Sequence, residues 1–177
     1  MRSLITFSVA FLLIAAIAGC KKDAACLFNF VISKNYTETD PNGTVMNTPN
    51  PDDWTYDHKW NACENSLFNF TDTCNYQVLT AATINNVIGF PNPFKNVLAF
   101  AAQETGSCVV KVVLVDDQMD ILHQITLSNQ NTSGNGVTVD FNFSGLSSKK
   151  HYRLYYRFYG NNKTVIYQGH GDLRTTQ

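Results

Sequence analysis

The last strand region of the sequence places an imidazole and a carboxylate close together. In Gly169-His170-Gly171-Asp172 the two groups stand two residues apart, each next to a glycine. Such a pair could form half of an acid–base or metal site. A turn that ends the preceding strand is the simpler interpretation. No nucleophile or second histidine stands at a recognisable spacing, so we expect no catalytic residue, no bound metal and no other cofactor.

A second group of candidates combines carboxylates with tryptophans. Asp52-Asp53-Trp54 is followed closely by Asp57-His58 and Trp60. Trp54 and Trp60 could stack on a sugar ring, which makes them the candidate glycan-binding residues. The alternative, which we favour, is a short helix in this segment, capped by one of the leading aspartates, with both tryptophans packed inside. The segment lacks the twelve-residue loop pattern of calcium sites.

The strand expected from His151 to Tyr159 has a strict alternation. One side of it is apolar and should lie in the core, whereas the other side forms a candidate binding face of Arg153, Tyr155, Arg157 and Tyr159. Arginine and tyrosine are common at binding hot spots, so an open face of this kind could bind a protein, a glycan or lipid phosphates. An ordinary solvated sheet face with cross-strand pairs is the alternative.

Cys20 follows a segment with the features of a secretory signal. Arg2 gives a positive start, residues 4–18 carry no charge, and Ile17-Ala18-Gly19 leads into the cysteine. The apolar stretch is too short for a comfortable membrane span. The segment resembles a bacterial lipobox, in which Cys20 becomes the first mature residue and carries the lipid. This predicts a signal peptide over residues 1–19 and an outer-membrane lipoprotein of the cell envelope, with the leaflet left open.

The remaining cysteines are Cys26, Cys63, Cys74 and Cys108. Four cysteines in an oxidising compartment predict two disulfides, with three arrangements open. Alternation directs Cys26 and Cys108 into the core, so we expect a Cys26–Cys108 bond and a local Cys63–Cys74 bond. If Cys26 lies in the core, only residues 21–25 separate the lipid from the fold, a reach of at most about 18 Å.

Composition narrows the class of protein. The 177 residues include 13 basic and 14 acidic side chains, for a net charge of −1. This balance argues against a nucleic-acid partner, which needs a basic surface. Removal of residues 1–19 from the 177 leaves 158, enough for one domain with a substantial core. Charged residues make up only 15% of the chain, and the Asn- and Thr-rich remainder is typical of exported envelope proteins.

The candidate site residues described above lie in or between short predicted strands. Alternation and turn residues predict an antiparallel, immunoglobulin-like β-sandwich in an all-β domain, with one short helix and long loops in its first part, although an open barrel fits as well. We expect a lipidated cysteine and tether over residues 20–25 and one domain over residues 26–177. Within it, residues 26–88 form an N-terminal elaboration and residues 89–177 a more regular sandwich part. The expected strands are 26–32, 76–80, 97–102, 108–115, 119–127, 137–143, 151–159 and 163–168.

Three features of the second half resemble a known family. These are Phe90-Pro91-Asn92-Pro93-Phe94, a strand, acidic turn and strand over Val110 to Leu122, and a late aromatic strand from Tyr152 to Phe158. Together they resemble the small C-terminal β-sandwich of type IX secretion cargo in Bacteroidota, over roughly residues 88–170. The chain continues past the late strand and has a lipobox, so the resemblance implies a shared fold type without a shared sorting role. The whole chain resembles the small lipoproteins that are plentiful in Bacteroidota, from which no activity carries over.

These features predict a non-enzymatic, lipid-anchored envelope protein with a structural or protein-interaction role, as an accessory lipoprotein of the outer membrane. Its partners would be the membrane, through the Cys20 lipid, and an envelope protein. A carbohydrate-binding surface lipoprotein is the alternative. A hydrolase that uses His170 and Asp172 is a distant third.

Overall fold

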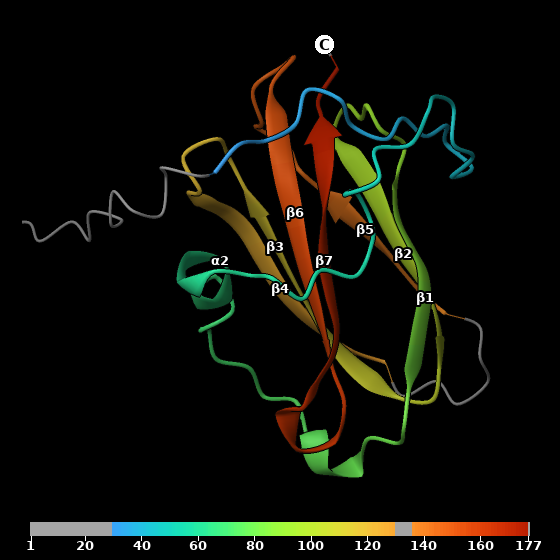
Figure 1. Cartoon of the computed structure of the whole chain (residues 1–177), viewed down its shortest axis with the longest axis vertical. Coiled ribbons are helices and arrows are strands. Elements are labelled where there is room, and N and C mark those ends of the chain that lie inside the picture. The colour runs from blue at the N-terminus through green and yellow to red at the C-terminus, as the bar shows by residue number, and fades with distance from the viewer. Residues whose placement is uncertain (1–29, 130–135, 177) are drawn as a thin grey trace, which may run out of the picture.

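Strand-forming stretches separated by turns build two antiparallel sheets that face each other (Figure 1). The computed structural model describes residues 30–129 and 136–176. One sheet has the strand order β1-β2-β5 and the other the order β4-β3-β6-β7. The all-β, antiparallel sandwich predicted from alternation is therefore confirmed. The strands are β1 (Thr83–Phe90), β2 (Val97–Thr105), β3 (Cys108–Val115), β4 (Ile121–Asn129), β5 (Val137–Asn142), β6 (His151–Tyr159) and β7 (Val165–Arg174).

The main core lies between the two sheets. The inward side chains of β6 are buried there, as the alternation predicts, and they pack against Phe100 of β2 and Phe141 of β5. Every residue of β3 is buried, whichever side of the sheet it faces. A strand buried on both faces needs apolar cover on its outer side as well.

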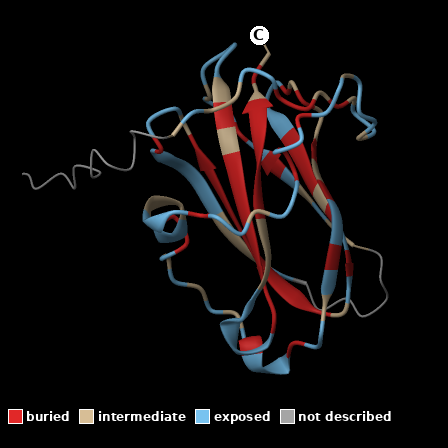
Figure 2. Cartoon of the chain, viewed as in Figure 1, coloured by how far each residue is buried: buried red, intermediate tan, exposed pale blue. Residues whose placement is uncertain are grey.

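Residues 50–79, here called the covering segment, supply that cover. The segment contains the short helix α2 (Ala62–Ser66) and the 3-10 helix η1 (Tyr76–Val78). It packs on the outer face of the β4-β3-β6-β7 sheet through two apolar clusters, one around Trp60 and one around Tyr76. Figure 1 shows it crossing in front of β6 and β7, and Figure 2 shows β6 buried along most of its length and β7 buried in its second half. The molecule thus has a third, irregular layer.

Several expected elements differ from the observed ones. Strand β1 was not expected, so the sandwich begins at residue 83 and not at 89. Residues 76–78 form η1 in place of a strand. Of the strand expected over 26–32, residues 30–32 are irregular and the rest lie outside the described residues. Helix α2 starts later than expected, because Asn61 caps it in a reciprocal capping box with Glu64.

Both predicted disulfides are wrong. Cys74 and Cys108 are free thiols, so neither the Cys26–Cys108 nor the Cys63–Cys74 bond forms. Cys108 does point into the core, where its thiol donates to Glu104 Oε2 at 2.7 Å. Cys63 is disulfide-bonded, but it packs in the cluster around Trp60, whereas Cys74 packs in the separate cluster around Tyr76. Cys20 and Cys26 lie outside the described residues.

No helix within residues 30–129 and 136–176 is long and apolar enough to span a membrane.

Candidate functional site

The covering segment is joined to the free edge of β7 by hydrogen bonds. The backbone N–H of Trp54 donates to the His170 carbonyl at 2.7 Å, and that of Asp57 donates to the Gln168 carbonyl at 2.9 Å. The side-chain amide of Gln168 in turn donates a hydrogen bond to the Asp57 carbonyl at 2.8 Å. The string Gly169-His170-Gly171-Asp172 is therefore part of strand β7, and the turn that we expected there is absent.

The glycines on either side of His170 make this close approach possible. A Cβ atom at Gly169 would lie 2.1 Å from the Thr55 carbonyl oxygen, and one at Gly171 would lie 2.3 Å from the Trp54 ring. On the facing strand β1, a Cβ atom at Gly89 would lie 2.5 Å from the same ring. Trp54 therefore closes the edge between the two sheets and is only 7% exposed. It cannot stack on a sugar as proposed from the sequence.

Three cross-strand pairs line the outer face of β6 and β7. Arg153 forms a bidentate ion pair with Asp172, with Nε–Oδ1 at 2.6 Å and Nη2–Oδ2 at 2.9 Å. The rings of Tyr155 and His170 lie 5.7 Å apart, and Arg157 Nε donates to Gln168 Oε1 at 3.1 Å. Cross-strand pairing was the alternative interpretation of this face, and these contacts support it.

The expectation of an open binding face is wrong, because the covering segment buries most of it. Arg157 lies between two aromatic rings, with its guanidinium 4.6 Å from Trp60 and 4.8 Å from Phe68. Tyr159 packs edge-on against Tyr76, and Tyr155 is fully buried. Trp60 is only 9% exposed, so it is a structural residue and not a glycan-stacking one.

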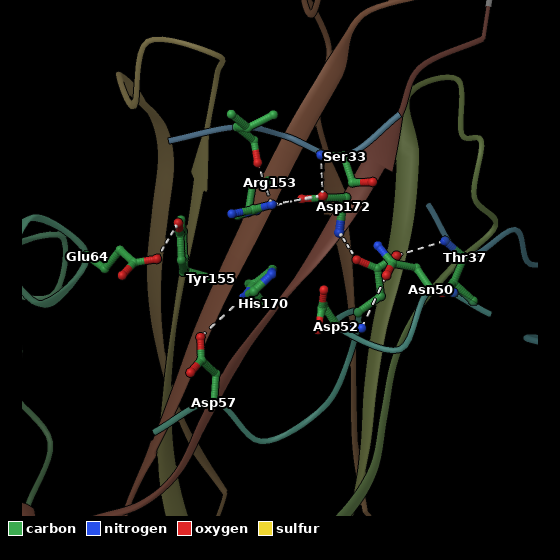
Figure 3. Close-up of polar contacts among 12 residues, drawn as sticks. Ser33, Thr37, Asn50, Asp52, Asp57, Glu64, Arg153, Tyr155, His170 and Asp172 are labelled. Atoms are coloured by element: carbon green, nitrogen blue, oxygen red, sulfur yellow. Dashed lines mark hydrogen bonds and ion pairs between the residues drawn. The ribbon is translucent and has the colours of Figure 1, made fainter. Parts of the chain in front are cut away.

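A cleft of about 600 Å³ remains where the covering layer is incomplete. Its volume is in the range of small-molecule sites. Arg153, His170 and Asp172 of the β6–β7 face form its base, and the covering segment and residues 31–33 form its sides (Figure 3). The structure thus brings together three segments that the sequence presented separately. The side residues are Val31, Ser33, Asn50, Asp52, Thr55, Tyr56, Asp57, His58 and Lys59.

The ion pair at the base is fully engaged within the protein. Asp172 accepts a further bond from the Ser33 N–H at 2.7 Å, and Arg153 Nη2 donates to the Val31 carbonyl at 3.0 Å. Burial by itself lowers the pKa of Arg153, but the bonds to Asp172 outweigh it and raise that pKa overall. Because the two charges neutralise each other and are held by further hydrogen bonds, the pair is a fixed structural part of the cleft base and supplies neither a free acid nor a free cation.

Asp53 supports the ion pair from behind. Its carboxylate accepts the N–H groups of Asp172 at 3.0 Å and Thr37 at 2.7 Å. Burial raises the pKa of Asp53 to about 6, and the nearby charge of Asp172 adds to that rise. Asp53 therefore ties the covering segment to β7 and to residue 37 through one buried side chain.

His170 is the group at the base without a complete set of partners. The residue is only 9% exposed, and its Nδ1 atom is buried without a hydrogen bond. Nδ1 lies 3.9 Å from Asp57 Oδ2 (Figure 3), which is too long for a direct bond and suits a bridging polar group. Burial, followed by the charge of Arg153, lowers the pKa of His170 to about 4. The imidazole is thus neutral at neutral pH.

Tyr56 supplies an exposed aromatic surface at the side of the cleft. Its side chain is 52% exposed. Its ring centroid lies 5.3 Å from that of Tyr167 and 5.9 Å from that of His58. We overlooked Tyr56 in the sequence, although it stands between residues of the carboxylate cluster that we singled out.

The serine and threonine hydroxyl groups that line the cleft donate to backbone carbonyls. Ser33 Oγ donates to the Asn35 carbonyl at 3.1 Å, and Thr55 Oγ1 donates to the Pro51 carbonyl at 3.4 Å. Neither of these bonds pairs a hydroxyl with His170, as activation of a nucleophile requires. In the described part of the chain, no three His, Cys, Asp or Glu side chains gather in a way that could hold a metal ion. The arrangement suits ligand binding better than nucleophilic catalysis.

No protein-family model matches the chain, and no curated protein matches it. The resemblance of residues 88–170 to the type IX cargo domain therefore stays a prediction. A sandwich fold by itself carries no function, so function is inferred from the cleft.

Proposed function

We propose that this protein is a lipid-anchored, non-catalytic binding protein of the cell envelope, and that its ligand is a saccharide held in the cleft. The observation that carries the proposal is the pairing of an exposed aromatic ring, Tyr56, with the unpartnered Nδ1 atom of His170 in one polar cleft. A sugar ring offers an apolar face for the aromatic ring and hydroxyl groups for the polar base.

The charges around the cleft favour a neutral, hydroxyl-rich ligand. Arg153 is already paired with Asp172, and His170 is neutral at neutral pH. The other charged side chains that line the cleft are Asp52, Asp57 and Lys59, so the local balance is slightly negative. A phosphate or carboxylate ligand would be repelled, whereas hydroxyl groups can donate to these carboxylates.

The gap between His170 Nδ1 and Asp57 Oδ2 defines one anchoring point. A ligand hydroxyl between them would donate its proton to Asp57 Oδ2 and accept from His170 Nδ1, in the imidazole tautomer that carries its hydrogen on Nδ1. A buried polar group without a hydrogen-bond partner lowers the stability of the fold by about 1–3 kcal/mol. A bound saccharide would satisfy Nδ1 at this point.

Envelope attachment belongs to the same proposal. The lipobox-like sequence before Cys20 supports lipidation, and the outer membrane is the proposed location. The protein-interaction role through Arg153, Tyr155, Arg157 and Tyr159 loses its support, because the covering segment packs over the last three and Asp172 pairs with Arg153. The hydrolase alternative lacks a nucleophile paired with His170.

Binding to a saccharide panel tests the proposal directly. We expect one or more oligosaccharides to bind the purified protein, and Tyr56→Ala to weaken that binding by at least about tenfold, as hot-spot aromatics do. Val78→Ala is the matched control, because Val78 is also an exposed apolar residue, in η1 and outside the cleft. Saccharide binding that survives Tyr56→Ala, or no binding across the panel, would contradict the proposal.

A further inference from the structure

A basic and apolar patch lies at the end of the sandwich where the described chain begins. It borders a second depression, of about 400 Å³, in which Phe30, Val31 and Ile32 are the apolar residues and Lys34, Lys149 and Lys150 the basic ones. In Figure 1 the blue start of the described chain and the orange loop before β6 lie at this same end. We call these six residues the basic end.

The basic end is available to a partner. Val31 is 74% exposed, an unusual value for an apolar side chain. Lys34, Lys149 and Lys150 are exposed as well. Salt bridges within the described part of the chain engage Lys111, Arg153 and His170, so none of them neutralises these three lysines.

The local charge is positive. Asp117 is the carboxylate that lines the depression, and it stands against three lysines. Burial lowers the pKa of His151, which also lines the depression, and the charges of Arg174 and Lys34 lower it further. Cationic groups therefore outnumber anionic ones in this depression, which suits an anionic surface.

The position of Cys20 in the sequence indicates which anionic surface is within reach. Residues 21–29 are the nine residues that separate Cys20 from Phe30, and an extended chain of that length spans at most about 32 Å. If Cys20 carries the lipid, as proposed above, the basic end stays within that distance of the membrane.

We propose that the basic end docks on the anionic phospholipid headgroups of the membrane that holds the Cys20 lipid. Lys34, Lys149 and Lys150 pair with headgroup phosphates, and Val31 enters the interface between headgroups and acyl chains. This docking rests on the proposed lipid anchor. Val31 lines both this depression and the saccharide cleft. Docking therefore places the cleft beside the membrane surface, where it is open to saccharides close to that surface.

Vesicle binding tests the docking without the lipid. The mature chain with Cys20→Ser is mixed with phosphatidylcholine vesicles that contain phosphatidylglycerol, and separately with pure phosphatidylcholine vesicles. We expect it to sediment with the first and not with the second, and less so as salt rises. Each lysine near an anionic surface strengthens binding by about fivefold, so Lys149→Gln plus Lys150→Gln should weaken it by about 25-fold.

A control variant with the same change in net charge tests whether the basic end is the part of the protein that contacts the vesicle. Lys163→Gln plus Gln77→Glu also lowers the net charge by two, but it lies in the exposed helices η1 and η2 (Asn161–Lys163), at the other end of the sandwich. This pair should leave vesicle binding almost unchanged, whereas an equal loss in both pairs, or equal binding to both vesicle types, overturns the proposed docking. The mass of the wild-type N-terminal peptide reports lipidation separately, so the failure of one proposal is distinguishable from that of the other.

Discussion

At the scale of single residues, His170 at the base of the cleft and the buried Asp53 behind it affect the pH dependence of stability in opposite directions. The pKa of His170 is lowered to about 4 in the folded protein. As the pH falls below the ordinary pKa of histidine, the imidazole is therefore protonated in the unfolded chain but not in the folded one. Stability is then lost on acidification, by roughly 3 kcal/mol in all. The pKa of Asp53 is raised to about 6, so the folded chain is protonated first and stability is gained by roughly 3 kcal/mol.

Single substitutions separate the two effects. In the wild type, the loss of stability from His170 and the gain from Asp53 largely cancel between about pH 6 and pH 4, as the two pKa values require. His170→Gln removes the loss, so its free energy of unfolding should rise as the pH falls through this range. Urea unfolding at several pH values measures this difference. A wild-type profile that parallels that of His170→Gln would show that His170 titrates normally in the folded protein.

At the scale of elements, the contact between the covering segment and β7 depends on space left by glycine. The indole of Trp54 occupies the positions that Cβ atoms at Gly171 and Gly89 would need. Alternation correctly assigned the inward and outward residues of β6. The strand expected over residues 163–168 was ended at Gln168, whereas β7 continues to Arg174, so the pairing of Arg153 with Asp172 was missed. A hairpin extended to Arg174 would have placed Arg153 opposite Asp172.

A double-mutant cycle tests this contact. Gly171→Ala should destabilise the fold by about 1–3 kcal/mol through overpacking, and Trp54→Ala by about 3–5 kcal/mol through loss of a buried aromatic. Because both act on one contact, the double variant should be less destabilised than the sum of the two. Urea unfolding of the four proteins gives the coupling energy, and strictly additive values would mean that the two side chains do not compete for space.

At the scale of the whole molecule, the first part of the domain is a structural layer and not an appendage. It binds the sheet through buried polar contacts as well as apolar ones. Lys111 of β3 reaches Asp72 at 2.8 Å and the Phe70 carbonyl at 2.8 Å. The covering segment therefore belongs to the same folding unit as the sandwich.

The cysteine pairing is a prediction at this scale. The chain has five cysteines, of which Cys74 and Cys108 are free and Cys63 is disulfide-bonded. With Cys20 lipidated, Cys26 is the cysteine left for Cys63. Mass spectrometry of the mature protein under non-reducing conditions should find a lipid on Cys20 and one cross-linked peptide pair, Cys26 with Cys63. A Cys20–Cys63 pair would exclude the proposed anchor.

The sequence by itself determined which side chains share a face of each strand, because Cβ direction alternates with a period of two. It therefore indicated the sandwich, the inward Cys108 and the common face of Arg153 and Tyr155. Alternation is a local property, and it is the same for a solvated face and a covered one. Residues far away in the sequence decided that difference: Asn65 bonds Arg157 across 92 positions. Only that long-range packing turned an apparent open surface into a covered one and left the cleft over Arg153, His170 and Asp172.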